Sequence, residues 1–233
     1  MEKTGTLYED SESYYSKAGN YKKFSEAQDA LMKIPRFLKP RLKGKVVLDI
    51  GCGNGKYATL LAKVSKEYIG IDISKPQLLL AQKKNKNLKN VKFICCSAEN
   101  IPLHSKSVDV VLSTWGALST IKSLRRKAKV LKEAERILKI GGNIYSVEND
   151  SKGEWAEIRK HPKSSEKSHT WLLKKGFKIV KKLNIQFGFS SQEVAKNVMH
   201  SIYGNKVSKR INKKTIRHRV LIFNKINNLE NSA

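Results

Sequence analysis

Residues 46–57 read VVLDIGCGNGKY, and this stretch decides the fold. A short apolar run is followed by Gly51, Gly53 and Gly55, with Asp49 two positions before the first glycine. The run predicts a buried strand. The glycines predict a turn that a ligand approaches closely, because glycine has no Cβ and reaches positive φ. The spacing differs from the G-x-G-x-x-G dinucleotide fingerprint, and no Gly-Lys-Ser/Thr follows as in a P-loop.

A second strand ending in an acid follows the glycine turn. Apolar residues at helical spacing predict a helix over 56–66, and the run at 68–74 predicts a strand that reaches Asp72. Parallel strands joined by a helix end at the same edge of a sheet, so we expect Asp72 beside the glycines. A carboxylate there can accept both hydroxyls of a ribose. Ser74 is the expected N-cap of a helix over 76–87, which leaves Asp72 for the ligand.

The same order of strand and helix repeats further along the chain. Strands are predicted at 91–96 and 107–113, and an amphipathic helix at 128–138 precedes a strand at 143–148. The pair Gly141-Gly142 is predicted to be a helix C-cap and turn with a structural role. Alternating strands and helices of this kind indicate an α/β fold with a parallel sheet.

The pattern D-x-G-x-G-x-G after a strand resembles motif I of the class I S-adenosylmethionine (SAM) dependent methyltransferases, of the type 11-like kind. Residues 46–148 carry this resemblance. It implies a Rossmann-like α/β fold, in which helices cover both faces of a seven-stranded, mostly parallel sheet. It also implies SAM as methyl donor and S-adenosylhomocysteine (SAH) as product. The methyl group of SAM is already activated on a sulfonium, so no metal is expected.

The resemblance further implies which residues bind SAM. The acid that ends the second strand binds the ribose in this family, and that role falls to Asp72. Residues 97–102 resemble the segment D-A-x-x-L-P that reads the adenine ring, although Ser97 stands where the acid is usual; Ser97, the Ala98 backbone and Glu99 are all candidates. The predicted SAM-binding residues are Asp49, Gly51, Cys52, Gly53, Asn54, Gly55, Asp72, Ile73, Ser97, Ala98, Glu99 and Ser113.

The acceptor side of the site is less defined by sequence. In the family it lies beside the end of the fourth strand, here residues 113–118. The Asn/Asp-Pro-Pro-Tyr motif of many amino methylases is absent there, as is the cysteine pair of pyrimidine C5 methylases. Trp115 can stack on a planar acceptor or form the pocket wall, and Glu148 is a weak candidate base. His104 is the third candidate, although a surface histidine is the simpler interpretation. No catalytic base is assigned.

The charge of the chain leaves two kinds of acceptor open. Lys and Arg number 47 against 20 Asp and Glu, which gives a formal net charge of +27. Such a field attracts polyanions, so tRNA is one candidate partner. The glycine turn and residues 118–126 are similar to the tRNA wobble-uridine methyltransferases, but Gly116-Ala117 replace their His-His pair. Codon bias in an AT-rich genome also enriches lysine. A small-molecule acceptor is therefore favoured over tRNA.

A relative that uses decarboxylated SAM, such as an aminopropyltransferase, is disfavoured because no acidic cluster is present to bind a polyamine. An RNA-binding protein that has the same fold and uses SAM only as a ligand is the remaining alternative. The fractionation of a methyl-transfer reaction into RNA and metabolites separates these possibilities.

The length of 233 residues fits one methyltransferase domain at 45–233, preceded by a helical cap segment at 1–44. In the cap, a helix is expected over 27–38, and one of several tyrosines can touch SAM. The core motifs occupy 46–148. Within residues 151–233 we expect closing strands and a helical insertion. The ranges are a loop-rich stretch at 150–167, a helix at 170–176, strands at 178–185 and 219–226, and the insertion at 191–211.

The remaining features concern the compartment. No apolar run is long enough to span a bilayer, and the first residues lack the layout of a signal peptide. Cys52, Cys95 and Cys96 lack metal-ligand spacing, and the adjacent pair points to opposite faces of a strand. A reduced, cytoplasmic location is expected.

Overall fold

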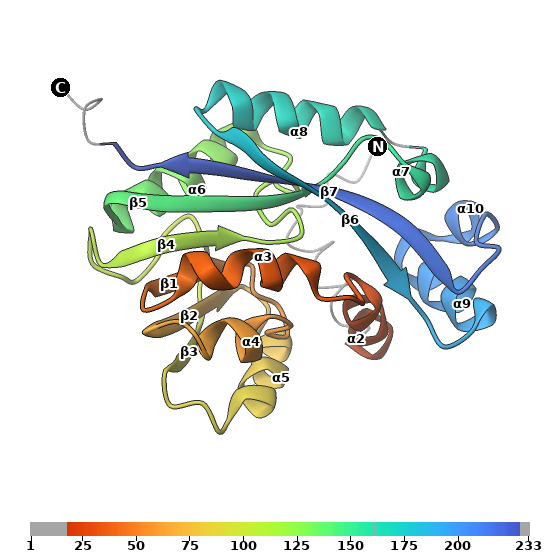
Figure 1. The fold of residues 1–233 in the computed structure, drawn as a ribbon, viewed down its shortest axis with the longest axis horizontal. Coiled ribbons are helices and arrows are strands. Elements are labelled where there is room, and N and C mark those ends of the chain that lie inside the picture. The colour runs from red at the N-terminus through yellow and green to blue at the C-terminus, as the bar shows by residue number, and fades with distance from the viewer. Residues whose placement is uncertain (1–17, 161, 229–233) are drawn as a thin grey trace, which may run out of the picture.

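The computed structural model describes residues 18–160 and 162–228. In this part of the chain, strands form one sheet in the order β3-β2-β1-β4-β5-β7-β6 (Figure 1). Neighbours from β3 to β5 are parallel, whereas β7 is antiparallel to both β5 and β6. The predicted class I methyltransferase fold is confirmed. The strands are β1 (Val46–Ile50), β2 (Glu67–Asp72), β3 (Val91–Cys95), β4 (Val108–Ser113), β5 (Leu138–Asn149), β6 (Lys178–Gly188) and β7 (Thr215–Ile226).

Helices cover both faces of the sheet (Figure 1). One face packs against α3 (Lys33–Leu42), α4 (Ala58–Ala62) and α5 (Lys75–Asn85). The other face packs against α6 (Leu124–Ile137) and α8 (Pro162–Lys174). Alternate residues of each parallel strand are buried in these two layers, which explains why the strands read as continuous apolar runs.

A third apolar cluster forms where β6 and β7 extend past the parallel strands (Figure 1). Four helices surround this extension, and an aromatic cluster that includes Phe24, Trp155 and Phe187 fills the space between them. The helices are α2 (Ala18–Ala27), α7 (Glu154–Arg159), α9 (Gln192–Tyr203) and α10 (Asn205–Ser208). The predicted insertion at 191–211 is therefore helical, and it packs against the start of the described chain.

The helix predicted at 27–38 is wrong in its bounds. The chain breaks after α2, where Asp29 and Met32 have positive φ, and α3 then continues through Pro40. Both carboxylate oxygens of Asp29 accept backbone N–H groups of α3, from Lys33 at 2.8 Å and Ile34 at 2.9 Å. A buried carboxylate that satisfies the first N–H groups fixes the start of α3 here, and periodicity alone does not reveal it.

Two other predictions need correction. Gly141-Gly142 do not cap a helix: α6 ends at Ile137, β5 begins at the next residue, and the pair lies at a bulge where the pairing with β4 shifts. A Cβ on Gly142 would lie 2.7 Å from Leu138 Cγ, so the bulge requires glycine. The stretch 150–167 holds α7 and the start of α8. Residues 96–107 join β3 to β4 without a helix. Within the described ranges, no helix is long and apolar enough to cross a membrane.

Candidate active site

The glycine loop is fixed to the end of β2 by backbone hydrogen bonds. The Gly51 and Cys52 N–H groups both donate to the Ile71 carbonyl, at 2.8 and 3.0 Å. The Gly53 N–H donates to Asp72 Oδ2 at 2.9 Å. Asp72 and the glycine loop therefore form one structural unit at the carboxyl edge of the sheet, as the strand order predicts.

The three glycines of this loop have positive φ but different surroundings. A Cβ on Gly55 would lie 3.0 Å from Ala81 Cβ of α5, and one on Gly51 would lie 2.7 Å from Ala117 Cβ. A Cβ on Gly53 would meet nothing within 4 Å. Gly55 thus permits helix packing, Gly51 permits the approach of the loop after β4, and Gly53 leaves an open side for a ligand.

Asp72 also caps the helix that follows it. Its Oδ1 accepts the Ser74 N–H at 2.9 Å, whereas the Ser74 side chain makes no capping hydrogen bond. Ser74 is the N-cap residue of α5, as predicted, but its side chain does not cap the helix, and Asp72 already accepts two backbone N–H groups. Burial raises the pKa of Asp72, and the hydrogen bonds from Ser74 and Gly53 oppose this shift. Each carboxylate oxygen has two acceptor sites, so both can accept a further ligand hydroxyl.

Asp49 lies in β1 under the loop and is buried. Its Oδ2 accepts the Tyr68 hydroxyl at 2.5 Å, and its Oδ1 has no partner within the described residues. Burial raises the pKa of Asp49 to about 7, although the Tyr68 hydroxyl lowers it. The buried Cys52 sulfur packs over Gly70, and its thiol donates to the Gly53 carbonyl of the loop at 3.8 Å.

The segment after β3 comes next to Asp72, because the Cys96 N–H donates to the Asp72 carbonyl at 3.1 Å. Ser97 Oγ accepts the Glu99 N–H at 3.2 Å. Glu99 Oε1 accepts Arg126 Nε at 2.6 Å, which ties this carboxylate to α6. Which of Ser97, Ala98 and Glu99 contacts adenine stays a prediction, as do Asn54 and Ile73 as SAM contacts.

The loop after β4 is held by side chains. Ser113 is buried, and its Oγ accepts the Leu118 N–H at 3.1 Å, so Ser113 fixes the loop. Trp115 has a φ of 57° and donates from Nε1 to the Tyr57 hydroxyl at 3.1 Å. The Tyr57 hydroxyl donates in turn to Asp29 Oδ2 at 3.2 Å. This chain of bonds joins the α2–α3 connection, the glycine loop and the β4 loop.

Lys56 makes a second link to the N-terminal helices. Its Nζ donates to the carbonyls of Ser25 and Gln28 at the end of α2. Burial lowers the pKa of Lys56 to about 7, and the charge of Asp29 opposes that shift. Sequence reasoning missed Asp29, Lys56 and Tyr57 as site-forming residues. The available signal was the position of Lys56 and Tyr57 directly after the third glycine.

Glu148 lies at the carboxyl end of β5 and is buried. Its Oε1 accepts the Ser146 hydroxyl at 2.6 Å, and a Cβ on Gly116 would lie 3.5 Å from its Oε2. Burial raises the pKa of Glu148, whereas Ser146, Ser119 and the charge of Lys127 lower it. The structure therefore places this predicted candidate beside the β4 loop.

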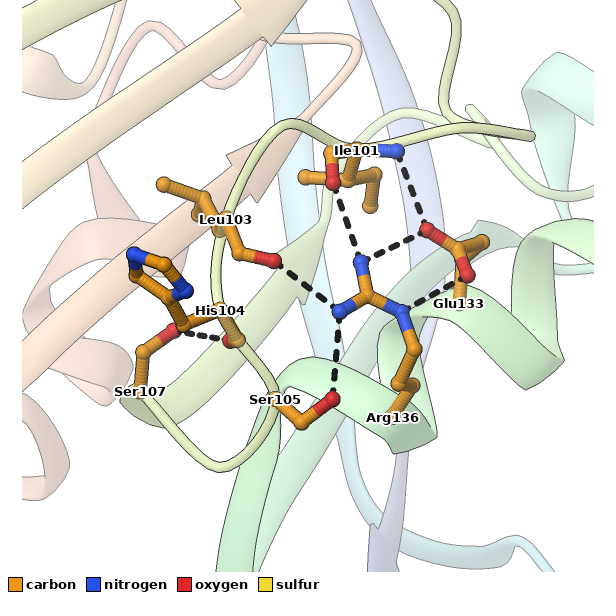
Figure 2. Close-up of polar contacts among 7 residues, drawn as sticks. All are labelled: Ile101, Leu103, His104, Ser105, Ser107, Glu133 and Arg136. Atoms are coloured by element: carbon orange, nitrogen blue, oxygen red, sulfur yellow. Dashed lines mark hydrogen bonds and ion pairs between the residues drawn. The ribbon is translucent and has the colours of Figure 1, made fainter.

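His104 lies elsewhere. It is exposed in the loop that leads into the amino end of β4, at the opposite edge of the sheet from the glycine loop. Arg136 of α6 holds this loop by donating to the carbonyls of Ile101 and Leu103, and Figure 2 shows the His104 ring turned away from this network. His104 is therefore a surface histidine, the simpler of the two interpretations, and not a catalytic candidate.

A histidine that the sequence reasoning passed over lies close to the site. His218 of β7 is buried, with its ring centroid 5.9 Å from that of Trp115. The predicted last strand began at residue 219, whereas β7 begins at Thr215. The alternation of Ile216 and Val220 with two arginines, with His218 in phase with the apolar positions, was the signal that could have placed His218 in the strand. Among the described residues, no group of three or more His, Cys, Asp or Glu side chains could hold a metal ion.

The chain belongs to the methyltransferase-domain family, whose model matches residues 41–215. The strand order and the glycine loop agree with this membership, and they place the chain among the class I SAM-dependent methyltransferases.

Two curated relatives have different acceptors in their names. The demethylmenaquinone methyltransferase of Staphylococcus carnosus is 26% identical over 150 residues, which cover 63% of this chain and 60% of the relative. The tRNA (carboxymethyluridine(34)-5-O)-methyltransferase of Arabidopsis thaliana is 33% identical over 112 residues, which cover 48% of this chain and 26% of the relative. The chain thus spans less than two thirds of each.

A solved structure supports the fold. The SAM-dependent methyltransferase from Aquifex aeolicus superimposes with a TM-score of 0.57 at 18% sequence identity, covering 88% of this chain and 97% of that one. At this identity the likeness shows the fold alone.

Proposed function

We propose that this protein is a SAM-dependent methyltransferase that acts on a small acceptor molecule held beside Trp115 and Glu148. The observation that carries the proposal is the open side of the glycine loop at Gly53, whose N–H is fixed by Asp72. A loop with backbone N–H groups, no Cβ and an adjacent carboxylate suits a nucleoside with a polar tail.

The residues at this edge fit SAM. Asp72 would bind the ribose hydroxyls, and the glycine loop would face the amino-acid part of the donor. The Asp49 Oδ1, which has no partner among the described residues, could accept a hydrogen bond directly or through water from the donor's ammonium group. When bound, SAM supplies a methyl group on a sulfonium for in-line transfer.

On the acceptor side, the side chains orient the nucleophile and receive its proton. Trp115 is fixed by Tyr57, so its ring offers a rigid wall for the acceptor. Burial raises the pKa of Glu148, which makes this carboxylate a better proton acceptor than an exposed one. Lys56 and Tyr57 join the glycine loop to the connection between α2 and α3.

A small acceptor is supported by the enclosed position of Trp115 and by the name of the S. carnosus relative. The alternative is a methyltransferase that acts on tRNA, or a binder of it, as the name of the A. thaliana relative suggests. The net charge of +27 favours this alternative, whereas Gly116-Ala117 depart from the His-His pair of wobble-uridine enzymes.

We also propose a reduced, cytoplasmic location, since Cys52, Cys95 and Cys96 are free. The division into a cap at 1–44 and a methyltransferase domain at 45–233 is likewise a proposal. Tyr8, Tyr14 and Tyr15, which could touch the donor, lie outside the described residues.

The test is methyl transfer from labelled SAM into a cell extract, with RNA separated from metabolites afterwards. We expect SAH to bind in calorimetry and the label to appear in the metabolite fraction. Label confined to RNA, together with tRNA binding that persists at physiological salt, would replace the small acceptor by tRNA. Absence of SAH binding would contradict the whole proposal.

Glu148→Gln tests the proposed base once an accepting fraction is found. We expect the rate to fall about 100-fold or more at pH 7 with SAH affinity unchanged, because the amide cannot take the proton. His104→Ala is the matched control at the opposite edge of the sheet, and it should leave the rate unchanged. Equal rates in Glu148→Gln and the wild type would remove Glu148 from the mechanism.

A further inference from the structure

The His218 imidazole is buried with unsatisfied nitrogens. It is 3% exposed, and neither Nδ1 nor Nε2 has a hydrogen-bond partner among the residues that the structure describes. Burial lowers its pKa to about 3, so the ring is neutral at pH 7 and presents one N–H donor and one acceptor. Leaving a buried polar group unsatisfied costs about 1–3 kcal/mol. Buried polar groups almost always have hydrogen-bond partners, so we expect a bound molecule to supply one for this ring.

The residues packed against His218 do not supply that partner. The ring stacks on Phe187 with centroids 5.1 Å apart and planes within 1°, and Trp155 contacts it in a T-shaped arrangement at 6.2 Å. Trp115 lies on another side, and its only N–H is already donated to Tyr57. The faces of the imidazole are thus satisfied by aromatic packing, but its polar edge is not.

Trp115 connects His218 with the donor side of the site. It is half-buried and belongs to the loop after β4, which approaches the glycine loop at Ala117. His218 shares a face of β7 with Ile216 and Val220, the face that packs under the N-terminal helices. The Trp115 ring therefore contacts both sides, with Lys56 Nζ of the glycine-loop segment 5.6 Å from its centroid and the His218 ring at 5.9 Å.

A positive charge lies near the same place. The Arg159 guanidinium stands over the rings of Trp155 and Tyr203, 5.8 and 5.7 Å from their centroids, and its charge also lowers the His218 pKa. In residues 18–160 and 162–228, no carboxylate forms an ion pair with Arg159. A guanidinium on an aromatic face, without an acidic partner, suits an anionic ligand group.

We propose that Trp115, His218 and Arg159 form the acceptor-binding site and that it takes a planar aromatic molecule carrying a carboxylate. This inference rests on the proposed methyltransferase function and names its substrate class. The acceptor ring packs on Trp115, its carboxylate pairs with Arg159, and the His218 N–H donates to the same carboxylate. His218 binds and positions the acceptor, whereas the proton of the nucleophile goes to Glu148.

The test uses the full chain loaded with SAH, with benzoate as the probe and neutral benzamide as the matched control. Binding is followed by NMR of ¹⁵N-labelled histidine ring nitrogens. We expect benzoate to shift the His218 signals saturably and benzamide to bind at least about tenfold more weakly, because it lacks the charge. Equal binding of the two, or no shift of His218 at millimolar benzoate, would overturn the proposal.

Two variants separate binding from packing. His218→Phe keeps the stacking and removes the nitrogens, and Arg159→Gln removes the charge. We expect each to weaken benzoate binding at least about tenfold without changing SAH affinity, and His218→Phe to raise the melting temperature, because an unsatisfied polar group is replaced by an apolar one. A purely structural histidine would give the higher melting temperature with benzoate binding unchanged, which would refute the site.

Separate measurements distinguish a failure of the proposed methyltransferase function from a failure of the proposed acceptor site. If the wild type binds no SAH in calorimetry, methyl transfer is contradicted, and the comparison of benzoate with benzamide on the protein alone still decides the acceptor site. If SAH binds and the benzoate comparison fails, only the acceptor class is overturned.

Discussion

The two halves of the site are built in different ways. The donor half consists of backbone groups and two carboxylates, Asp49 of β1 and Asp72 of β2, and all of them lie within residues 49–72. The acceptor half consists of side chains from the β4 loop, α7 and β7, of which Trp115, Arg159 and His218 are the central ones. A backbone site depends on local conformation, whereas a side-chain site depends on long-range packing.

This difference explains why the two halves can vary independently. Any sequence that keeps the glycine turn and the acid keeps the donor half, because the backbone makes the hydrogen bonds. Changes in a few distant side chains alter the acceptor half without touching that turn. The curated relatives, whose names give acceptors as different as demethylmenaquinone and a tRNA uridine, agree with this view.

The largest expected effect is in the donor half. Asp72→Ala should weaken SAH binding about 1,000-fold, because it removes two charge-assisted hydrogen bonds to the ribose and the anchor of the Gly53 N–H. Calorimetry measures the affinity. Glu67→Ala is the control on the same strand, since Glu67 pairs with Lys92 at the amino end of β2. Comparable losses in both variants would show that Asp72 does not act locally.

Asp49 gives the donor half a pH dependence. Its pKa is raised to about 7 in the folded chain, so its contribution to stability is full below about pH 4 and is lost as the pH rises to 7. Asp49→Asn lacks this titration. The free energy of unfolding of the variant minus that of the wild type should therefore increase between pH 4 and pH 8, by at most about 4 kcal/mol. Urea unfolding at several pH values measures the gain, and a constant difference would show that Asp49 is ionised throughout.

The glycines separate ligand binding from packing within the donor half. Gly55→Ala should destabilise the fold by about 2–4 kcal/mol, because positive φ and the contact with Ala81 are both unfavourable. Gly53→Ala should cost about 1 kcal/mol, since its Cβ meets open space, but it should weaken SAH binding at least about tenfold. Urea unfolding and calorimetry measure the two quantities. A larger loss of stability in Gly53→Ala, or a larger loss of SAH affinity in Gly55→Ala, would contradict the assignment of Gly53 to the ligand side of the loop.

The smallest effect concerns the link between the halves. Tyr57→Phe leaves the Trp115 N–H without its acceptor and removes one donor from Asp29, which should lower the free energy of unfolding by about 1–2 kcal/mol. Thermal or urea unfolding measures the loss. Ser107→Ala removes an exposed hydrogen bond to the His104 carbonyl and should cost less than about 0.5 kcal/mol. Equal losses would mean that the buried chain of bonds is not important for stability.

Local sequence patterns predicted most of the fold. All seven strands were predicted, because each combines an apolar run with turn residues that act locally, but β5 and β7 begin five and four residues before their predicted starts. The errors fall where a distant contact decides the backbone. Asp29 ends α2 and caps α3 through a buried carboxylate, and Gly141 lies in a β-bulge whose partner strand begins 33 residues earlier, at Val108.

By itself, the sequence determined the glycine loop and the position of Asp72 beside it: glycine spacing and a carboxylate at a strand end suffice because the backbone conformation they require is local. Only the tertiary structure decided the acceptor half. In the folded chain His104 lies at the edge of the sheet opposite the glycine loop, and Glu148 is buried beside the β4 loop. His218 contacts Trp115, although more than 100 residues separate them in the chain. Burial and the partners of a side chain are properties of the packed molecule, and no local pattern encodes them.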